Sequence, residues 1–528
     1  MTPSTTSKSS ALGRTTVGGV AWLLAQTLAN RGVGVISQIA LAWLLIPADF
    51  GQFGLALSIV LMVGPLTSFG VDDVLLQRSA RSRVWAPPAF WTGLIAGLVS
   101  MMLVLIAAPF LGEAYRAPRI VGVMAVLAVA IPVASLSTVP MVTLRAQLRF
   151  KTLACIGTAE FAGQQALTVA LAAAGMGAYA FAIPVLAVAA IKAAVLWRMA
   201  RPSLKVGRLG LFRLLAQRGG SVFLSRILIA LRHQGDVAIL GLFATQVQVG
   251  LYFFALRIAA QPVQMFAGSL NTVLFPALVH LSGDRSRQLA ASLNAARTLA
   301  FLITPICFMQ AAVAEPLLTL LFGAKWAGAI LPIQFLSLGL AFDGVAWVAG
   351  ALLTARGHFR LGAIYNAVML AIFVAVVLTS SLPGRAAYAA LAVGGFYAVV
   401  PPAYSWLVFR RYGAASRDVL GLYFRPTLIA GAAVGTAWAV SRLGPWGADP
   451  FWTCAVVGLV GVALYAGLAR WLMADLFAQT LARLLGRFSR PGRIAVAVPD
   501  RPCRRRRPRP TGPAAGWPDR AGSGSQPP

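Results

Sequence analysis

The stretch LIAGLVSMMLVLIAAPFL, residues 94–111, contains no charged side chain. A helix needs ~20 apolar residues to cross the hydrocarbon core of a bilayer, so this stretch alone predicts a membrane-spanning helix. Comparable uncharged stretches recur along the chain, at residues 120–144, 161–191, 361–384, 386–409 and 451–469. The sequence therefore predicts an all-α membrane protein that crosses the bilayer many times.

The composition supports this fold class and excludes several functions. Hydrophobic residues make up 59% of the 528 residues and charged residues only 11%, whereas ~25% is usual for soluble domains. The net charge of +31 lies in connections and in the C-terminal tail, so we expect no nucleic-acid partner. The four cysteines form no C-x-x-C pair, and no phosphate-binding loop or His/Glu metal pattern occurs. We therefore expect no metal and no cofactor.

Hydropathy divides the chain into about 14 transmembrane helices. We place them at residues 15–46, 50–74, 88–111, 119–142, 152–174, 178–199, 219–243, 249–278, 293–314, 327–354, 361–382, 386–408, 421–441 and 451–472. The first is longer than one minimal crossing and must tilt or project from the bilayer.

The basic residues of the connections test this division. If the N-terminus is cytoplasmic, the internal even-numbered connections are cytoplasmic too, and they should hold the excess of Lys and Arg. They contain Arg78, Arg81, Arg83, Arg145, Arg149, Lys151, Arg198, Arg201, Lys205, Arg208, Arg213, Arg218, Arg285, Arg287, Arg356, Arg360, Arg410, Arg411, Arg417 and Arg425. The opposite connections contain only Arg116, Arg119, Lys325, Arg385 and Arg442. The asymmetry predicts a multi-pass protein of the inner (cytoplasmic) membrane with both termini in the cytoplasm.

A weak internal repeat predicts two related halves. LAWLLIPADFGQFGLALSIV (41–60) and AILGLFATQVQVGLYFFALRI (238–258) share an apolar helix, a short polar turn, a Gly with an aromatic residue, and a second apolar helix. The offset is about 199 residues and includes six spans, an even number, so both copies insert in the same direction. We expect two pseudo-symmetric six-helix lobes related by an axis along the membrane normal.

These observations give the expected domain boundaries. Residues 1–14 form a cytoplasmic N-terminus, 15–199 the N-lobe with spans 1–6, 200–218 a cytoplasmic inter-lobe linker, 219–408 the C-lobe with spans 7–12, and 421–472 spans 13 and 14. Residues 473–528 form a basic, Pro- and Arg-rich cytoplasmic tail, which we expect to be disordered beyond about 490. Adhesion to anionic lipid is one interpretation of the tail, and a segment of biased composition without a role is the other.

Ionisable residues at bilayer depth are the candidate functional residues, because a central Arg, Lys or Asp costs ~2.5–3.5 kcal/mol and usually faces a cavity or a partner. Arg31 and Arg232 lie at similar depths on the first helices of the two expected lobes, and Arg226 and Arg257 lie on spans 7 and 8. If they point into a shared cavity, their guanidinium groups suit a phosphate-containing anion. Alternatively, Arg226 extends to the inner surface, and Arg232 pairs with Asp236 one helical turn away.

Acidic residues and a histidine at the same depth are candidates for ion or proton coupling. Asp236 and His233 lie on span 7, Glu160 on span 5 and Asp343 near the middle of span 10. Imidazole titrates near neutral pH, so a His233–Asp236 pair would suit a proton relay. The alternative is a hydrogen bond that only holds helices together.

Two stretches resemble a known family. GVAWLLAQTLANRGVGVISQIALAWLLIPADFGQFGLALSIV (19–60) is similar to the opening of polysaccharide flippases, in which a long first helix precedes a short turn and an (E/D)-(F/Y)-G step. GDVAILGLFATQVQVGLYFFALRIAAQPVQMFAGSLNTVLFPALV (235–279) is similar to their span 7–8 region. The group belongs to the multidrug/oligosaccharidyl-lipid/polysaccharide exporter superfamily, and the resemblance covers roughly residues 12–475.

The resemblance implies a transporter, not an enzyme, that moves a polyprenyl-diphosphate-linked glycan from the cytoplasmic to the periplasmic leaflet by alternating access. Arg31, Arg232 and Arg257 would then bind the diphosphate. Membrane lipids, a polysaccharide polymerase and chain-length proteins are the implied partners. The alternatives are an ion-coupled multidrug exporter of the same superfamily, a flippase for peptidoglycan precursors, and a membrane-embedded sugar polymerase or ligase.

Overall fold

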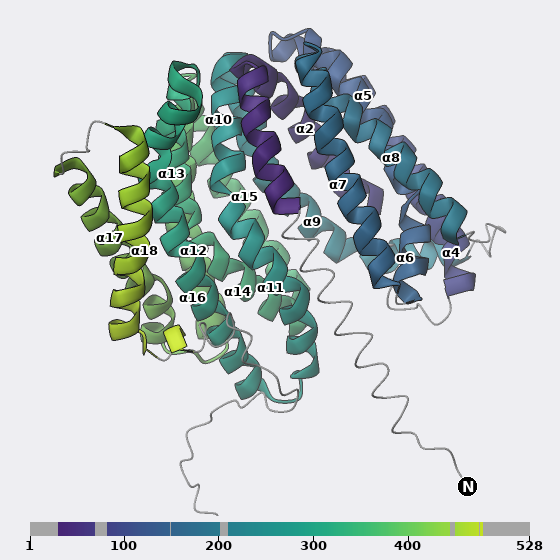
Figure 1. Cartoon of the computed structure of the whole chain (residues 1–528). Coiled ribbons are helices and arrows are strands. Elements are labelled where there is room, and N and C mark those ends of the chain that lie inside the picture. The colour runs from purple at the N-terminus through teal and green to yellow at the C-terminus, as the bar shows by residue number, and fades with distance from the viewer. Residues whose placement is uncertain are drawn as a thin grey trace, which may run out of the picture. The chain divides into compact units, whose positions relative to one another are not determined.

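The computed structural model describes residues 30–68, 82–147, 149–200, 210–443, 449–474 and 476–478 (Figure 1). No β-strand occurs within these ranges, so the predicted all-α class is confirmed for the described chain. The predicted cytoplasmic N-terminus, most of the tail and the first half of the first span lie outside the described residues.

The first half begins with a helix over residues 30–44. The helices that follow are α2 (Pro47–Ser68), α4 (Ser82–Ala114), α5 (Arg119–Ser135), α6 (Thr138–Ala146), α7 (Phe150–Ala173) and α8 (Tyr179–Ala200). The pair α5 and α6 occupies the predicted fourth span and is bent by 41° at its break.

The second half contains α9 (Gly210–Phe243), α10 (Gln246–Ala259), α11 (Gln261–His280), α12 (Arg285–Phe322), the short 3-10 helix η2 (Gly323–Ala329), α13 (Ile330–Leu340), α14 (Asp343–Ala355), α15 (Phe359–Ser381) and α16 (Ala386–Arg411). The first turns of α9 occupy positions 210–218, which the sequence placed in the linker. The predicted eighth span is interrupted at Ala260, and Pro262 follows in the first turn of α11. A proline fits that position because the first turn leaves its amide nitrogens unbonded.

Nine helices within the described ranges are long and apolar enough to cross a membrane, or ten if the bent α5–α6 pair is one span. Each predicted span overlaps a described helix or a broken pair of helices, the first span only from residue 30 and the second only to residue 68. Several of these helices are too polar or too short to pass that test. The multi-pass fold is therefore established, and the count of 14 crossings stays a prediction.

The same packing pattern occurs in both halves. In the first half α2 packs on α5, α4 on α5, α5 on α8, and α7 on α8. The corresponding pairs of the second half are α10 with α13, α12 with α13, α13 with α16, and α15 with α16. This correspondence is what the 199-residue repeat predicts. The last helices, α17 (Ser416–Leu443) and α18 (Pro450–Leu472), pack on each other and on α12 (Figure 1).

Candidate functional site

The two halves meet where α2 and α10 begin. A Cβ atom built on Gly51 would overlap with the carbonyl oxygen of Gln246, and one built on Gly250 would overlap with the carbonyl oxygen of Pro47. Only glycine lets two helix backbones approach this closely. Gly51 and Gly250 are separated by 199 positions, and so are Pro47 and Gln246, so the crossing is symmetric. We call this end of the helices the crossing end.

Aromatic side chains fill the crossing end. The ring of Phe50 makes edge contacts with Phe181 at 5.0 Å, Trp326 at 5.1 Å and Phe254 at 5.7 Å between centroids. Phe254 stacks on Trp326 at 4.1 Å. All four side chains are buried and come from both halves of the chain. Edge and stacked contacts between buried rings each add ~0.5–1.5 kcal/mol to their area burial. The crossing end is therefore packed shut.

Polar contacts close the same end. The helix over residues 30–44 ends with carbonyl groups that have no partner within the helix. Lys325 Nζ donates to the carbonyl oxygens of Ala42 at 3.1 Å and Trp43 at 2.9 Å, and Trp326 Nε1 donates to that of Ala42 at 3.0 Å. Trp43 Nε1 in turn donates to the Leu321 carbonyl oxygen at 2.7 Å. We call these contacts between the first helix and the α12–η2 segment the latch.

Arg232 lies on α9, eleven residues before the helix end at Phe243, which is about 17 Å along the axis. Its side chain is 8% exposed. Nη2 lies 3.3 Å from His233 Nε2, and the guanidinium carbon lies 5.9 Å from the centre of the Tyr397 ring. Nε and Nη1 are buried without a hydrogen-bond partner among the described residues. A buried charge with unused donors is costly, so this group is suited to bind an anion.

The alternative pairing of Arg232 with Asp236 does not occur. Asp236 instead accepts hydrogen bonds from Tyr252 Oη at 2.7 Å and from the Val237 amide at 2.8 Å. The reason is geometric, because Tyr252 on α10 reaches the carboxylate at the contact between α9 and α10. The predicted hydrogen bond between His233 and Asp236 is likewise not formed, since the ring nitrogen of His233 contacts Arg232.

Asp343 is the second buried carboxylate near Arg232. It begins α14, is 3% exposed and accepts a hydrogen bond from Trp347 Nε1 at 2.8 Å. Asp343 and Arg232 are close enough for their charges to interact, although they form no ion pair. Arg232, Asp236, Asp343, Tyr252 and Tyr397 thus form one buried group, which we call the second-half polar cluster.

Arg31 links the two halves at a similar depth. It is half-buried, lies thirteen residues before Leu44, or about 20 Å, and donates from Nη1 to Gln261 Oε1 at the α10–α11 break. Arg257 lies one helical turn before that break, half-buried, with its guanidinium carbon 5.9 Å from the Phe253 ring centre. Arg226 is half-buried on α9, about 26 Å from the helix end.

Glu160 has a partner that the sequence interpretation missed. Lys192 on α8 donates to Glu160 Oε1 on α7 at 2.9 Å, and the two side chains are 19% and 32% exposed, respectively. The pair lies within the first half. A lysine inside an otherwise uncharged stretch was the signal that could have revealed it. Tyr252, Tyr397 and Gln261 were also missed, because nothing in their local sequence indicates contact with residues on other helices. Trp347 was missed too, although its spacing of four residues from Asp343 on one helix is a local signal that could have revealed it.

Comparisons with known proteins show which family the chain resembles. Residues 40–331 match the family described as "Polysaccharide biosynthesis protein". The succinoglycan biosynthesis transport protein ExoT of Rhizobium meliloti is 23% identical over 343 residues, which cover 64% of this chain and 68% of that protein. The lipopolysaccharide biosynthesis protein WzxC of Escherichia coli K12 is 21% identical over 376 residues, covering 70% and 76%.

Among solved structures, the lipid II flippase MurJ in an inward closed conformation aligns with a TM-score of 0.68 at 14% identity, covering 88% of this chain and 99% of that one. The fold is therefore similar to that of this flippase. Because its family match covers more than half of the residues, the chain belongs to the polysaccharide biosynthesis protein family. The resemblance predicted from residues 19–60 and 235–279 is confirmed, and the chain is a transporter, not an enzyme.

Proposed function

We propose that this protein moves a polyprenyl-diphosphate-linked oligosaccharide across the inner membrane, from the cytoplasmic to the periplasmic leaflet. The family and the transport proteins among the relatives support this class of substrate. We further propose that both termini are cytoplasmic, and that a polysaccharide polymerase and chain-length proteins receive the product. The glycan would be a repeat unit of an exopolysaccharide, capsule or O-antigen.

The main support for the proposal is the buried environment of the Arg232 guanidinium. Its guanidinium is buried about 17 Å along α9 from the crossing end, and two of its nitrogens have no hydrogen-bond partner among the described residues. A diphosphate oxygen would satisfy these donors, and charge-assisted hydrogen bonds of this kind contribute ~1.5–3 kcal/mol each. Arg31 and Arg257, at comparable depths, would complete the diphosphate site, and Arg226 would meet the substrate nearer the cytoplasm.

The crossing end supports an alternating-access mechanism. The short connections at this end hold few basic residues, whereas the opposite end contains Arg356, Arg410 and Arg411. By the positive-inside rule, this distribution supports a periplasmic position for the crossing end. In this orientation the Gly51–Gly250 crossing, the aromatic packing and the latch close the periplasmic side. Release of the glycan there would require the latch to open as the halves rock apart.

The second-half polar cluster contains two buried carboxylates, Asp236 and Asp343, but only one arginine. If both carboxylates are ionised, one negative charge remains without a counter-charge. We propose that a proton or another monovalent cation compensates it, and that Asp236 and Asp343 couple its movement to transport. Glu160, by contrast, is neutralised by Lys192 and is a structural residue in this proposal.

The test uses a strain that lacks the gene and accumulates lipid-linked repeat units in the cytoplasmic leaflet. Arg232→Gln and Arg31→Gln are each expected to reduce restored surface glycan ~10- to 100-fold, because each removes charge-assisted bonds to the diphosphate. Arg470→Gln is the control, since Arg470 is exposed in the last turn of α18. Full restoration of surface glycan by both Arg31 and Arg232 variants would exclude the proposed diphosphate site.

A further inference from the structure

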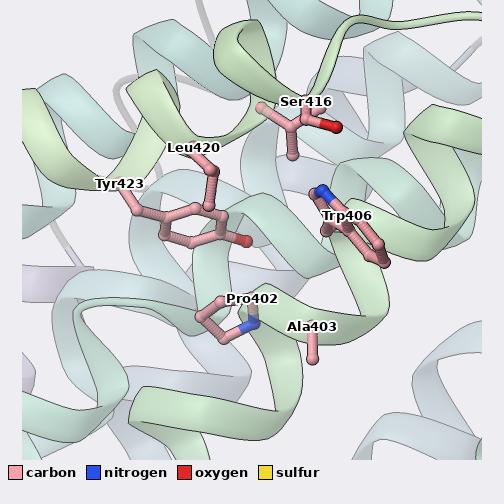
Figure 2. Close-up of a pocket in the computed structure, with 7 residues that line it drawn as sticks. Pro402, Ala403, Trp406, Ser416, Leu420 and Tyr423 are labelled. Atoms are coloured by element: carbon pink, nitrogen blue, oxygen red, sulfur yellow. The ribbon is translucent and has the colours of Figure 1, made fainter.

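A groove lies between α16 and α17. Its volume is about 460 Å³, within the ~300–1,000 Å³ range of ligand sites. Figure 2 shows the side chains of Pro402, Ala403, Trp406, Leu420 and Tyr423 around the hollow. Ser416, at the first position of α17, is the remaining labelled lining residue. The lining is therefore mainly apolar, with hydroxyl groups and an indole as its polar atoms.

The groove opens on an apolar surface. Leu420 is 59% exposed, and its neighbour Phe424 is 65% exposed. Leu407, on the adjoining turn of α16, is also exposed. Large apolar side chains gathered in this way mark a surface that contacts lipid or a partner. In a multi-pass membrane protein, the surrounding lipid is the available apolar medium.

Positive charge surrounds one end of the groove. α16 ends with Arg410 and Arg411, and Arg417 is the second residue of α17; all three are exposed. The guanidinium carbon of Arg410 lies 5.0 Å from the centre of the Trp406 ring, which lines the groove. Asp418 is the acidic residue in the same turn, so three cations oppose one anion at the groove's end.

A fourth cation, Arg356, lies on the connection between α14 and α15. The guanidinium carbon of Arg356 is 4.0 Å from the centre of the Tyr412 ring, and the Tyr412 hydroxyl is 2.6 Å from His358 Nδ1. These contacts hold the connection that follows α16 in place. The charged end of the groove is thus built from three segments of the second half.

The groove is shorter than one leaflet. Its lining on α17 extends from Ser416 to Tyr423, seven residues or about 10 Å along the helix. Half of a ~30 Å hydrocarbon core is about 15 Å. The groove therefore has room for the part of one acyl chain nearest its head group. A polyprenyl chain, which is much longer, would extend far beyond it.

We infer that this groove binds an anionic phospholipid of the cytoplasmic leaflet. Its phosphate group would lie between Arg410 and Arg417, and one acyl chain would lie along Ala403, Trp406 and Leu420. Positive charge at the end of the groove favours phosphatidylglycerol over zwitterionic lipids, with a ~5-fold contribution per basic residue near the surface. The inference does not depend on which substrate the protein transports.

The test titrates the purified full-length protein in detergent with phosphatidylglycerol and counts bound lipid by native mass spectrometry. We expect one tightly bound phosphatidylglycerol, and ~25-fold weaker binding in the Arg410→Gln/Arg417→Gln double variant. Arg470→Gln, which removes an exposed arginine from the same membrane face, should bind like the wild type. Phosphatidylcholine should bind the wild type as weakly as phosphatidylglycerol binds the double variant.

A second variant distinguishes lipid binding in the groove from lipid binding to basic surface residues alone. Ala403→Trp fills the groove and keeps every arginine, so it should also lose the bound phosphatidylglycerol. Ala432→Trp is its control, because Ala432 is exposed on α17 but does not line the groove. Equal binding of phosphatidylcholine and phosphatidylglycerol to the wild type would overturn the inference. So would phosphatidylglycerol binding that neither the double variant nor Ala403→Trp weakens. Displacement of phosphatidylglycerol by undecaprenyl phosphate at equal concentration would overturn it as well.

Discussion

Gly51 and Gly250 are 199 positions apart in the sequence and in backbone contact in the structure. A Cβ atom built on either glycine would lie 3.0 Å from the amide nitrogen of the other. The contact relates one half of the chain to the other, because each glycine occupies the same position in its own copy of the repeat. The repeat thus accounts for the point at which the two halves close on each other.

Gly51→Ala is expected to weaken this closure. The new methyl group would overlap with the Gln246 carbonyl oxygen, and backbone cannot move aside as cheaply as a side chain. Overpacking of this kind typically costs ~1–3 kcal/mol. Thermal unfolding of the purified protein should therefore show a lower midpoint temperature, and Gly250→Ala should have the same effect because of the symmetry.

Gly163→Ala is the matched control for both variants. Gly163 is exposed within α7, and a Cβ atom built on it would meet nothing within 4 Å. Replacing glycine inside a helix by alanine stabilises it by ~0.5–1 kcal/mol. Midpoints of the Gly51 and Gly250 variants that equal or exceed that of Gly163→Ala would show that the crossing is not tightly packed.

The sequence predicted the relation of the two halves better than it predicted the site. Hydropathy and the repeat depend on residues close together in the chain, so they indicated the helices and the relation of the halves. The partners of Asp236 and Arg232 come from α10, α14 and α16, and only the packing of those helices brings them together. Local spacing instead suggested the Arg232–Asp236 pair, which does not form because the Tyr252 hydroxyl binds the carboxylate.

Lys325→Met is expected to loosen the latch. The substitution removes the hydrogen bonds to the Ala42 and Trp43 carbonyl oxygens. Ala42 keeps the hydrogen bond from Trp326 Nε1, so we expect the loss of about two ordinary hydrogen bonds, each worth ~0.5–1.5 kcal/mol. The distance between spin labels at Leu44 and Leu320, both exposed, should shift toward longer values in double electron–electron resonance. Lys192→Met, which removes a lysine within the first half, should leave this distance unchanged. An unaltered distribution in Lys325→Met would mean that the latch does not hold the halves together.

Glu160 and Lys192 should behave as a structural pair. Glu160→Gln or Lys192→Met alone leaves a charge without its partner in a half-buried place, at a cost between the ~1 kcal/mol of exposed pairs and the ~3 kcal/mol of buried ones. The double variant should recover much of this loss, because no unpaired charge remains. Thermal unfolding of the four proteins gives the coupling energy. Additive losses, or transport abolished in the double variant, would instead indicate that Glu160 has a functional role.

Asp236→Asn is expected to separate ion coupling from substrate binding. Asparagine keeps an oxygen that accepts the Tyr252 hydroxyl hydrogen bond, but it cannot carry the negative charge that a proton or cation would neutralise. Transport of lipid-linked glycan in proteoliposomes should fall about tenfold and lose its response to an imposed proton or sodium gradient. Asp418→Asn changes an exposed acid at the start of α17 and should retain the response. If Asp236→Asn also retained it, the charge of the second-half polar cluster would have no part in driving transport, and Asp236 would only hold α9 against α10 through Tyr252.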